Sequence, residues 1–215
     1  MLQLEGVHKS FTKNGLTREV LSGVDATFLP GDAVGILGRN GAGKSTLMRI
    51  MAGVEHPTKG RVRRRMSISW PMGYDAAVHG NLTGADNTRF IARLYDRPVS
   101  WMEGFVQDFS EIGDEFREPV KNYSAGMKAR FIFALSMAVE FDCYLIDEVI
   151  AAGDARFAER CRQALLARRS KSALILVSHQ IHTVRTLCTH AAILDEGRLT
   201  FHEDLDQAFA EYGEL

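Results

Sequence analysis

One stretch decides the fold of this chain: Gly38-Arg39-Asn40-Gly41-Ala42-Gly43-Lys44-Ser45-Thr46. It fits the pattern G-x-x-x-x-G-K-[S/T] of loops that cradle phosphates. The apolar run Val34–Leu37 before it predicts a buried strand, and a helix is expected to begin near Lys44 and to run to about Met51. Glycines let such a backbone curl until several N–H groups point at one phosphate, and the helix N-terminus adds positive potential. The stretch therefore predicts a phosphate-binding loop.

Two side chains of this loop suit a bound nucleotide. Lys44 can reach the β- and γ-phosphates, and the Ser45 hydroxyl can ligate Mg²⁺. The other positions expected to contact the nucleotide are Gly38, Asn40, Gly41, Ala42, Gly43 and Thr46. The loop alone does not separate kinases, GTPases and motor ATPases, so the class must come from other segments.

A second apolar run, Cys143–Ile146, ends in the two carboxylates of Asp147 and Glu148. A carboxylate at the end of a strand can hold Mg²⁺, usually through water, and we expect Asp147 to do so. Glu148 can then polarise the attacking water, as a general base or as the group that orients it. Downstream of a phosphate-binding loop, this pair predicts nucleotide hydrolysis.

Several further segments resemble the motifs of ABC ATPases. Asn122-Tyr123-Ser124-Ala125-Gly126-Met127-Lys128 resembles the ABC signature motif and keeps its serine and one glycine, Ser124 and Gly126. Val177-Ser178-His179 looks like the switch histidine, and Ala151-Ala152-Gly153-Asp154 stands where the family has its D-loop. Phe11, upstream of the phosphate-binding loop, is similar to the aromatic residue that stacks on adenine.

This resemblance covers nearly the whole chain and implies an ATP hydrolase that uses ATP and Mg²⁺. It implies catalytic roles for Lys44, Glu148 and His179, and Mg²⁺ ligation by Ser45 and Asp147. It also implies that each chain holds half of two active sites, so that ATP joins two copies head to tail. Ser124, Gly126 and Asp154 would then contribute to nucleotide binding in that homodimer.

One residue of the family pattern is missing. ABC ATPases normally carry a glutamine at the edge of their helical insertion, where it helps to hold Mg²⁺ and senses the membrane partner. The chain has no glutamine between Gln3 and Gln107, and the corresponding stretch reads Ser67-Ile68-Ser69-Trp70-Pro71-Met72-Gly73-Tyr74. We assign no residue to that role.

Other segments are similar to the ATPase subunits of bacterial capsular polysaccharide exporters, whose relatives export O-antigen and teichoic acid: Ser69–Gly73, Leu82–Asn87, Tyr123–Met127 and Asp147–Val149. The resemblance implies a separate integral membrane permease as partner and polysaccharide as the cargo of the complex. It also implies a peripheral position on the cytoplasmic face of the bacterial inner membrane.

The amino-acid composition is that of a globular protein. The 215 residues are 46% hydrophobic and 25% charged, and the net charge of −1 gives no general attraction to nucleic acid. The three cysteines, Cys143, Cys161 and Cys188, are scattered, which favours a reducing, cytosolic setting. The longest apolar run, about Phe131 to Val139, is far shorter than the roughly 20 residues that cross a bilayer. We therefore expect a partner to supply the membrane-spanning part.

Strands that alternate with helices predict an α/β fold with a mainly parallel sheet. The resemblance makes this a P-loop NTPase fold of the ABC ATPase type, with an N-terminal antiparallel β part. We expect a single domain over residues 1–215, with a helical subdomain at about residues 70–140. Three other readings stay open: an exporter of another cargo, such as O-antigen or teichoic acid, a soluble ABC-type mechanical ATPase acting on ribosomes or DNA, and a P-loop kinase with a small-molecule substrate.

Overall fold

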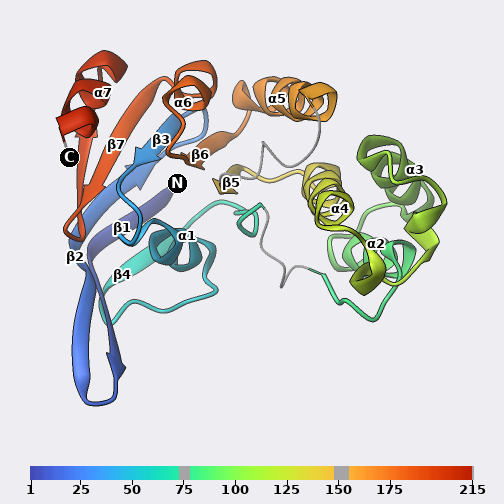
Figure 1. The fold of residues 1–215 in the computed structure, drawn as a ribbon, viewed down its shortest axis with the longest axis horizontal. Helices are drawn as coiled ribbons and strands as arrows, with labels where there is room; N and C mark the ends of the chain where they lie inside the picture. The colour runs from blue at the N-terminus through green and yellow to red at the C-terminus, as the bar shows by residue number, and fades with distance from the viewer. Residues whose placement is uncertain (73–77, 148–154, 215) are drawn as a thin grey trace. The chain divides into compact units, whose positions relative to one another are not determined.

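The computed structural model describes residues 1–72, 78–147 and 155–214 (Figure 1). The chain forms two compact units. The first contains Met1–Pro71, the strand after Phe141 and the C-terminal part from Leu165. The second contains most of the middle third of the chain, together with the first part of helix α5 (Ala155–Arg169).

A five-stranded sheet forms the centre of the first unit, in the order β5-β6-β3-β7-β8. Its strands are β3 (Ala33–Leu37), β5 (Cys143–Asp147), β6 (Ala173–Val177), β7 (His190–Asp195) and β8 (Arg198–His202). All neighbours are parallel except β7 and β8, which form an antiparallel pair. Strands β3 and β6 are buried along their whole length, as expected of central parallel strands. The predicted α/β class with a mainly parallel sheet is confirmed.

A second, antiparallel sheet comes from the N-terminal part of the chain, in the order β2-β1-β4. Strand β1 (Leu2–Lys13) pairs with β2 (Leu16–Phe28) and with β4 (Lys59–Arg64). Strands β1 and β2 continue into a long hairpin (Figure 1, blue). The start of β2, Leu16–Glu19, is exposed and does not alternate in polarity, so no local pattern predicts it as a strand.

Helix α1 (Lys44–Ala52) packs in one hydrophobic core with residues from both sheets. This core includes Leu4 of β1, Phe28 of β2, Ile36 of β3, Met48 of α1 and Leu145 of β5. On β3, a Cβ added at Gly35 would lie 2.4 Å from Cγ1 of Val184, so helix α6 (Ile181–Leu187) approaches the backbone of that strand closely. The strand before the phosphate-binding loop is therefore held by packing from several elements.

The second unit is helical, as predicted for the middle of the chain. It contains α2 (Gly84–Leu94), α3 (Val99–Ser110), the short 3₁₀ helices η2 (Gly113–Arg117) and η3 (Val120–Asn122), and α4 (Ala125–Ala138). Helix α2 begins after the N-cap residue Thr83, whose hydroxyl oxygen accepts the backbone N–H of Asp86 at 3.0 Å. The last helix of the chain, α7 (Leu205–Glu214), belongs to the first unit. None of the described helices has the length and apolar character needed to cross a membrane.

Candidate functional site

The turn from β3 into α1 needs its glycines for two different reasons. Gly41 and Gly43 adopt φ of 84° and 106°, in the left-handed region where a side chain is strained. Gly38 is buried against β7, and a Cβ there would lie 2.4 Å from the backbone oxygen of Leu194. The backbone amide of Ala42 closes the turn by donating to the oxygen of Arg39 at 3.1 Å. The three glycines and the hydrogen bond from Ala42 thus shape the loop.

Lys44 is the first residue of α1 and is only 8% exposed. Its Nζ donates to the backbone oxygen of Gly38 at 2.6 Å and to that of Arg39 at 3.0 Å. An ammonium that spans the loop in this way is close to where a phosphate would lie against the N-terminus of α1. The predicted phosphate-binding lysine therefore lies inside the loop that it would serve.

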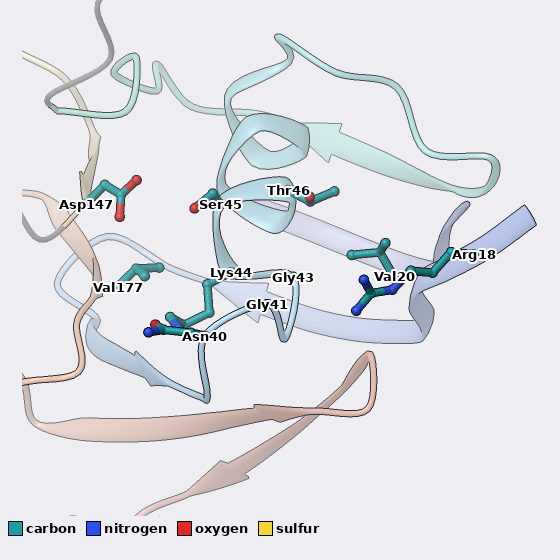
Figure 2. A pocket seen from close by; sticks show the side chains of 10 residues that line it. All are labelled: Arg18, Val20, Asn40, Gly41, Gly43, Lys44, Ser45, Thr46, Asp147 and Val177. Atoms are coloured by element: carbon teal, nitrogen blue, oxygen red, sulfur yellow. The ribbon is translucent and has the colours of Figure 1, made fainter. Parts of the chain in front are cut away.

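A pocket of about 340 Å³ lies beside this loop (Figure 2). It is lined by seven of the predicted site residues: Asn40, Gly41, Gly43, Lys44, Ser45, Thr46 and Asp147. Val177, Arg18 and Val20 complete the lining, and the latter two come from the long hairpin. The sequence analysis missed Arg18 and Val20, since no local motif marks them and only the pairing of β2 brings them here.

Asp147 is brought to the pocket by the order of the strands. It is the last residue of β5 and pairs in register with Val177, the last residue of β6. Strand β6 in turn pairs with β3, which leads into the loop, so the carboxyl ends of these strands meet at one edge of the sheet. Figure 2 shows the Asp147 carboxylate and the Ser45 hydroxyl directed toward one another. One carboxylate and one hydroxyl oxygen are ligands that suit Mg²⁺. Glu148 and Asp154, two further predicted site residues, lie outside the described residues.

His179 follows β6 and is exposed. It lines a second hollow, of about 490 Å³, with Arg39, Asn40 and Tyr212 of α7. Asn40 also lines the pocket beside the loop, so the two hollows share one residue. The structure therefore places the predicted switch histidine next to the phosphate-binding loop, and it adds Tyr212, which the sequence analysis did not single out.

Phe11 does not line either hollow, although its surroundings are close to the pocket. The residue is 40% exposed on β1, and its partner across the hairpin is Arg18, which does line the pocket. The Nζ atom of Lys9 lies 4.9 Å from the centre of the Phe11 ring and covers one face of it. A role for Phe11 in stacking on adenine remains a prediction.

The signature-like segment lies in the second unit, at the start of α4. Ser124 is the N-cap residue of this helix, and its hydroxyl oxygen accepts the N–H of Met127 at 3.2 Å. Both Ser124 and Gly126 are exposed. Tyr123 just before them is buried, packs edge-on against Phe131 at 5.8 Å, and has its pKa raised to about 12 by burial. Tyr123 thus anchors the segment, which leaves Ser124 and Gly126 at the surface.

The stretch that lacks the family glutamine runs beside β5. Ile68 forms a parallel bridge to Cys143, and the Ser69 hydroxyl oxygen accepts the backbone N–H of Leu145 at 2.9 Å. Trp70 packs edge-on against Phe141, with their ring centres 5.4 Å apart. Residues 73–77 of this region lie outside the described residues. The segment up to Trp70 therefore supports the strand that carries Asp147.

Known proteins resemble the chain in sequence and in fold. The sequence profile of the family described as "ABC transporter" matches residues 21–151. The ATP-binding protein BexA of Haemophilus influenzae is 50% identical over 214 residues, which cover 100% of this chain and 99% of the relative. The capsule polysaccharide export ATP-binding protein CtrD of Neisseria meningitidis serogroup B is 48% identical and covered over 100% of both chains. A solved dimeric, post-hydrolysis structure of the ATP-binding cassette MJ0796, bound to ADP and Pi, has a TM-score of 0.82 at 19% identity and covers 94% of this chain and 98% of that chain.

Proposed function

The chain belongs to the ABC transporter family, and we propose that it hydrolyses ATP to energise the export of capsular or related cell-surface polysaccharide through a separate membrane permease. The observation that carries the ATPase part is the pocket that joins Lys44, Ser45 and Asp147 around the N-terminus of α1. The cargo is supported by the 48% identity, over the whole chain, to a protein named for capsule polysaccharide export.

The pocket residues divide the work of handling ATP. The N–H groups of the loop and the ammonium of Lys44 would hold the β- and γ-phosphates. Ser45 and Asp147 would hold Mg²⁺, which neutralises phosphate charge when it is bound. Glu148 would orient the attacking water, and His179 would contact the γ-phosphate from the end of β6. Hydrolysis would then remove the γ-phosphate, and with it the contacts that these residues make to it.

ATP is also proposed to join two copies of the chain. Ser124 and Gly126 of one copy would face the γ-phosphate held by the loop of the other copy, and Asp154 would contribute to the same nucleotide site. The exposure of Ser124 and Gly126 at the N-terminus of a 14-residue helix supports this, because such an end favours an anion. Hydrolysis would loosen this homodimer and so pass a conformational change to the permease.

The whole chain is proposed to act as one ABC ATPase domain on the cytoplasmic face of the bacterial inner membrane. Its helical subdomain, at about residues 70–140, is the part proposed to dock the permease. The apolar side chains exposed on α2 support this, because Phe90 is 61% exposed and Leu94 is 62% exposed.

Complementation tests the proposed function directly. A bacterium that lacks its own capsule-export ATPase but keeps the permease is given the wild-type chain, and surface polysaccharide is measured with a capsule-specific antibody. We expect the wild type to restore capsule, and Lys44→Ala, present at the same level, not to restore it. A wild-type chain that hydrolyses ATP in vitro but restores no capsule in any such host would refute the polysaccharide cargo.

A further inference from the structure

We infer that Arg18 binds the nucleoside half of the nucleotide, an inference that rests on the proposed ATP binding. Arg18 belongs to none of the motifs that mark the phosphate-binding loop. It lies on β2, on the hairpin, and still lines the same pocket as Lys44 and Ser45. A charged side chain that β2 contributes to this pocket can bind part of the nucleotide.

The pocket has two chemically different ends. Ser45 and Asp147, the proposed Mg²⁺ ligands, mark the end where the terminal phosphates would lie. Figure 2 shows Arg18 and Val20 on the opposite side of the loop from Asp147. A nucleotide whose phosphates lie against Lys44 and Ser45 would therefore extend its ribose and base toward Arg18 and Val20.

The guanidinium of Arg18 is available for a ligand. The residue is exposed, and its side chain has no ion pair or hydrogen bond with any residue in the described ranges. Its neighbour Glu19 alternates to the other face of the strand and pairs with His8 at 2.9 Å. Arg18 is thus not held in place by the carboxylate that follows it in sequence.

The position opposite Arg18 strengthens the case. Phe11 faces Arg18 across the hairpin, so both side chains lie on one face of it. One face of the Phe11 ring is already covered by Lys9, whose Nζ is fixed by Glu55 at 3.0 Å and by the backbone oxygen of His56 at 2.9 Å. No cation or ring of the described residues covers the Arg18 guanidinium in this way, and it offers a flat surface for a base.

The chemistry of the side chain fits the nucleoside. A guanidinium is planar, stacks on aromatic rings and donates in-plane hydrogen bonds of the kind that ribose hydroxyls accept. Val20 beside it adds an apolar surface of the kind that suits a ring. A lysine in this place would keep the charge but would lose the plane.

The experiment compares ATP with tripolyphosphate, which has the phosphates and no nucleoside. Dissociation constants with Mg²⁺ are measured by calorimetry on the full chain for the wild type, Arg18→Ala, Arg18→Lys and a control, Lys13→Ala, on the same hairpin. We expect Arg18→Ala to weaken ATP binding about fivefold to tenfold, the size typical of a stacked cation, and to leave tripolyphosphate unchanged. Arg18→Lys should recover only part of the loss, and Lys13→Ala should behave as the wild type.

Steady-state ATPase kinetics give a second, independent readout. Because Arg18 is far from the terminal phosphate in this arrangement, Arg18→Ala should raise KM for ATP and leave kcat near the wild-type value. Equal losses for ATP and tripolyphosphate, full recovery by Arg18→Lys, or unchanged ATP affinity in Arg18→Ala would each overturn the inference. A wild-type chain that binds no ATP would instead overturn the proposed function, so the two failures can be told apart.

Discussion

Ser124 and Gly126 are both exposed at the start of α4, but only Ser124 has a structural role there. Ser124 caps α4, and a Cβ added at Gly126 would meet no atom within 4 Å. Gly126 also has no positive φ that would require a glycine. Nothing within the described chain therefore explains a glycine at this place, whereas the close approach of a second copy with its nucleotide would explain it.

This predicts that Gly126→Ala separates stability from assembly. The substitution should leave the free energy of unfolding in urea unchanged or raise it by up to about 1 kcal/mol, because alanine is the better helix former. It should nevertheless reduce ATP-dependent dimerisation in a background that does not hydrolyse ATP, as measured by light scattering. Gly104→Ala is the matched control, since Gly104 lies in α3 and is also surrounded by open space. A Gly126→Ala variant that dimerises like its parent would contradict the assignment of the signature segment.

The residues of the site differ in how far the sequence revealed them. Lys44, Ser45 and Asp147 could be predicted, because a local pattern of glycines or an apolar strand fixes where each side chain lies. Arg18 and Tyr212 could not, because each reaches a hollow only through tertiary pairing or packing of its element. Phe11 is the opposite case. Its place in the order of the motifs predicted a contact with adenine, but the pocket is lined by its partner across the hairpin, Arg18.

Among the elements, helix α1 is held at its C-terminal end by an arginine from another element. Arg64, the last residue of β4, donates from Nε to the Met51 oxygen at 2.8 Å and from Nη2 to the Ile50 oxygen. Partial burial lowers its pKa from the usual value. A cation that satisfies the last carbonyls of a helix stabilises it through hydrogen bonds and through the helix dipole.

We therefore expect Arg64→Ala to lower the free energy of unfolding by about 1 to 2 kcal/mol in urea titrations. Arg65→Ala, one residue further along the chain and exposed, should change it by less than about 0.5 kcal/mol. Because α1 also carries Lys44 and Ser45, the affinity for ATP should fall in Arg64→Ala but not in Arg65→Ala. Equal unfolding curves for the two variants would show that the contacts of Arg64 do not stabilise α1.

The segment that follows α1 is tied to β1 by a carboxylate. Glu55 bonds Lys9 of β1 at 3.0 Å and Arg49 of α1 at 3.1 Å. Partial burial alone would raise its pKa, but the hydrogen bonds from Lys9 and Arg49 outweigh burial and lower the pKa below 4.5. A lowered folded-state pKa means that the stabilisation is present above the unfolded value and is lost as the pH falls through the folded value.

The pH dependence of the free energy of unfolding tests the contribution of these two ion pairs. Glu55→Gln should be less stable than the wild type at pH 7 by about 1 kcal/mol, and it should lose less stability than the wild type as the pH falls from about 5 to 3. Urea unfolding at several pH values measures both effects. The control is Glu203→Gln, at an exposed position after β8, which should keep the acid dependence of the wild type. Parallel acid profiles for Glu55→Gln and the wild type would show that Glu55 does not contribute to the loss of stability in acid.

At the level of elements, prediction succeeded where burial is uniform and failed where it is not. The strands β3 and β5 are short, apolar and nearly fully buried, so an apolar run between turns was enough to find them. Strand β2 has an exposed first part and a second part in which buried and exposed residues alternate, and its first part is a strand only because it pairs with β1. Helix α6, with only seven residues, was also missed, because it is too short to show a periodic pattern.

For the whole molecule, the central expectation is an assembly that depends on ATP. Glu148→Gln should bind ATP, lose most turnover and shift from monomer to dimer only when Mg²⁺-ATP is added. The phosphate that both copies contact is then not removed. Lys44→Ala is the control that should neither bind ATP tightly nor dimerise. The measurement is mass in solution by light scattering; a Glu148→Gln variant that binds ATP but stays monomeric would contradict the proposed active site shared by two copies.

The strand order also has a consequence during synthesis of the chain. Among the described strands, β5 pairs only with β6, and β6 separates β5 from β3. The ribosome completes Asp147 well before it completes Val177. Strand β6 is therefore absent for the time needed to add roughly 30 residues, a few seconds at about 5–20 residues per second. Until then the nascent chain exposes apolar strand edges and has no complete nucleotide pocket. ATP can therefore stabilise the chain only after most of it has emerged, and an earlier arrest should yield a product that chaperones or proteases recognise.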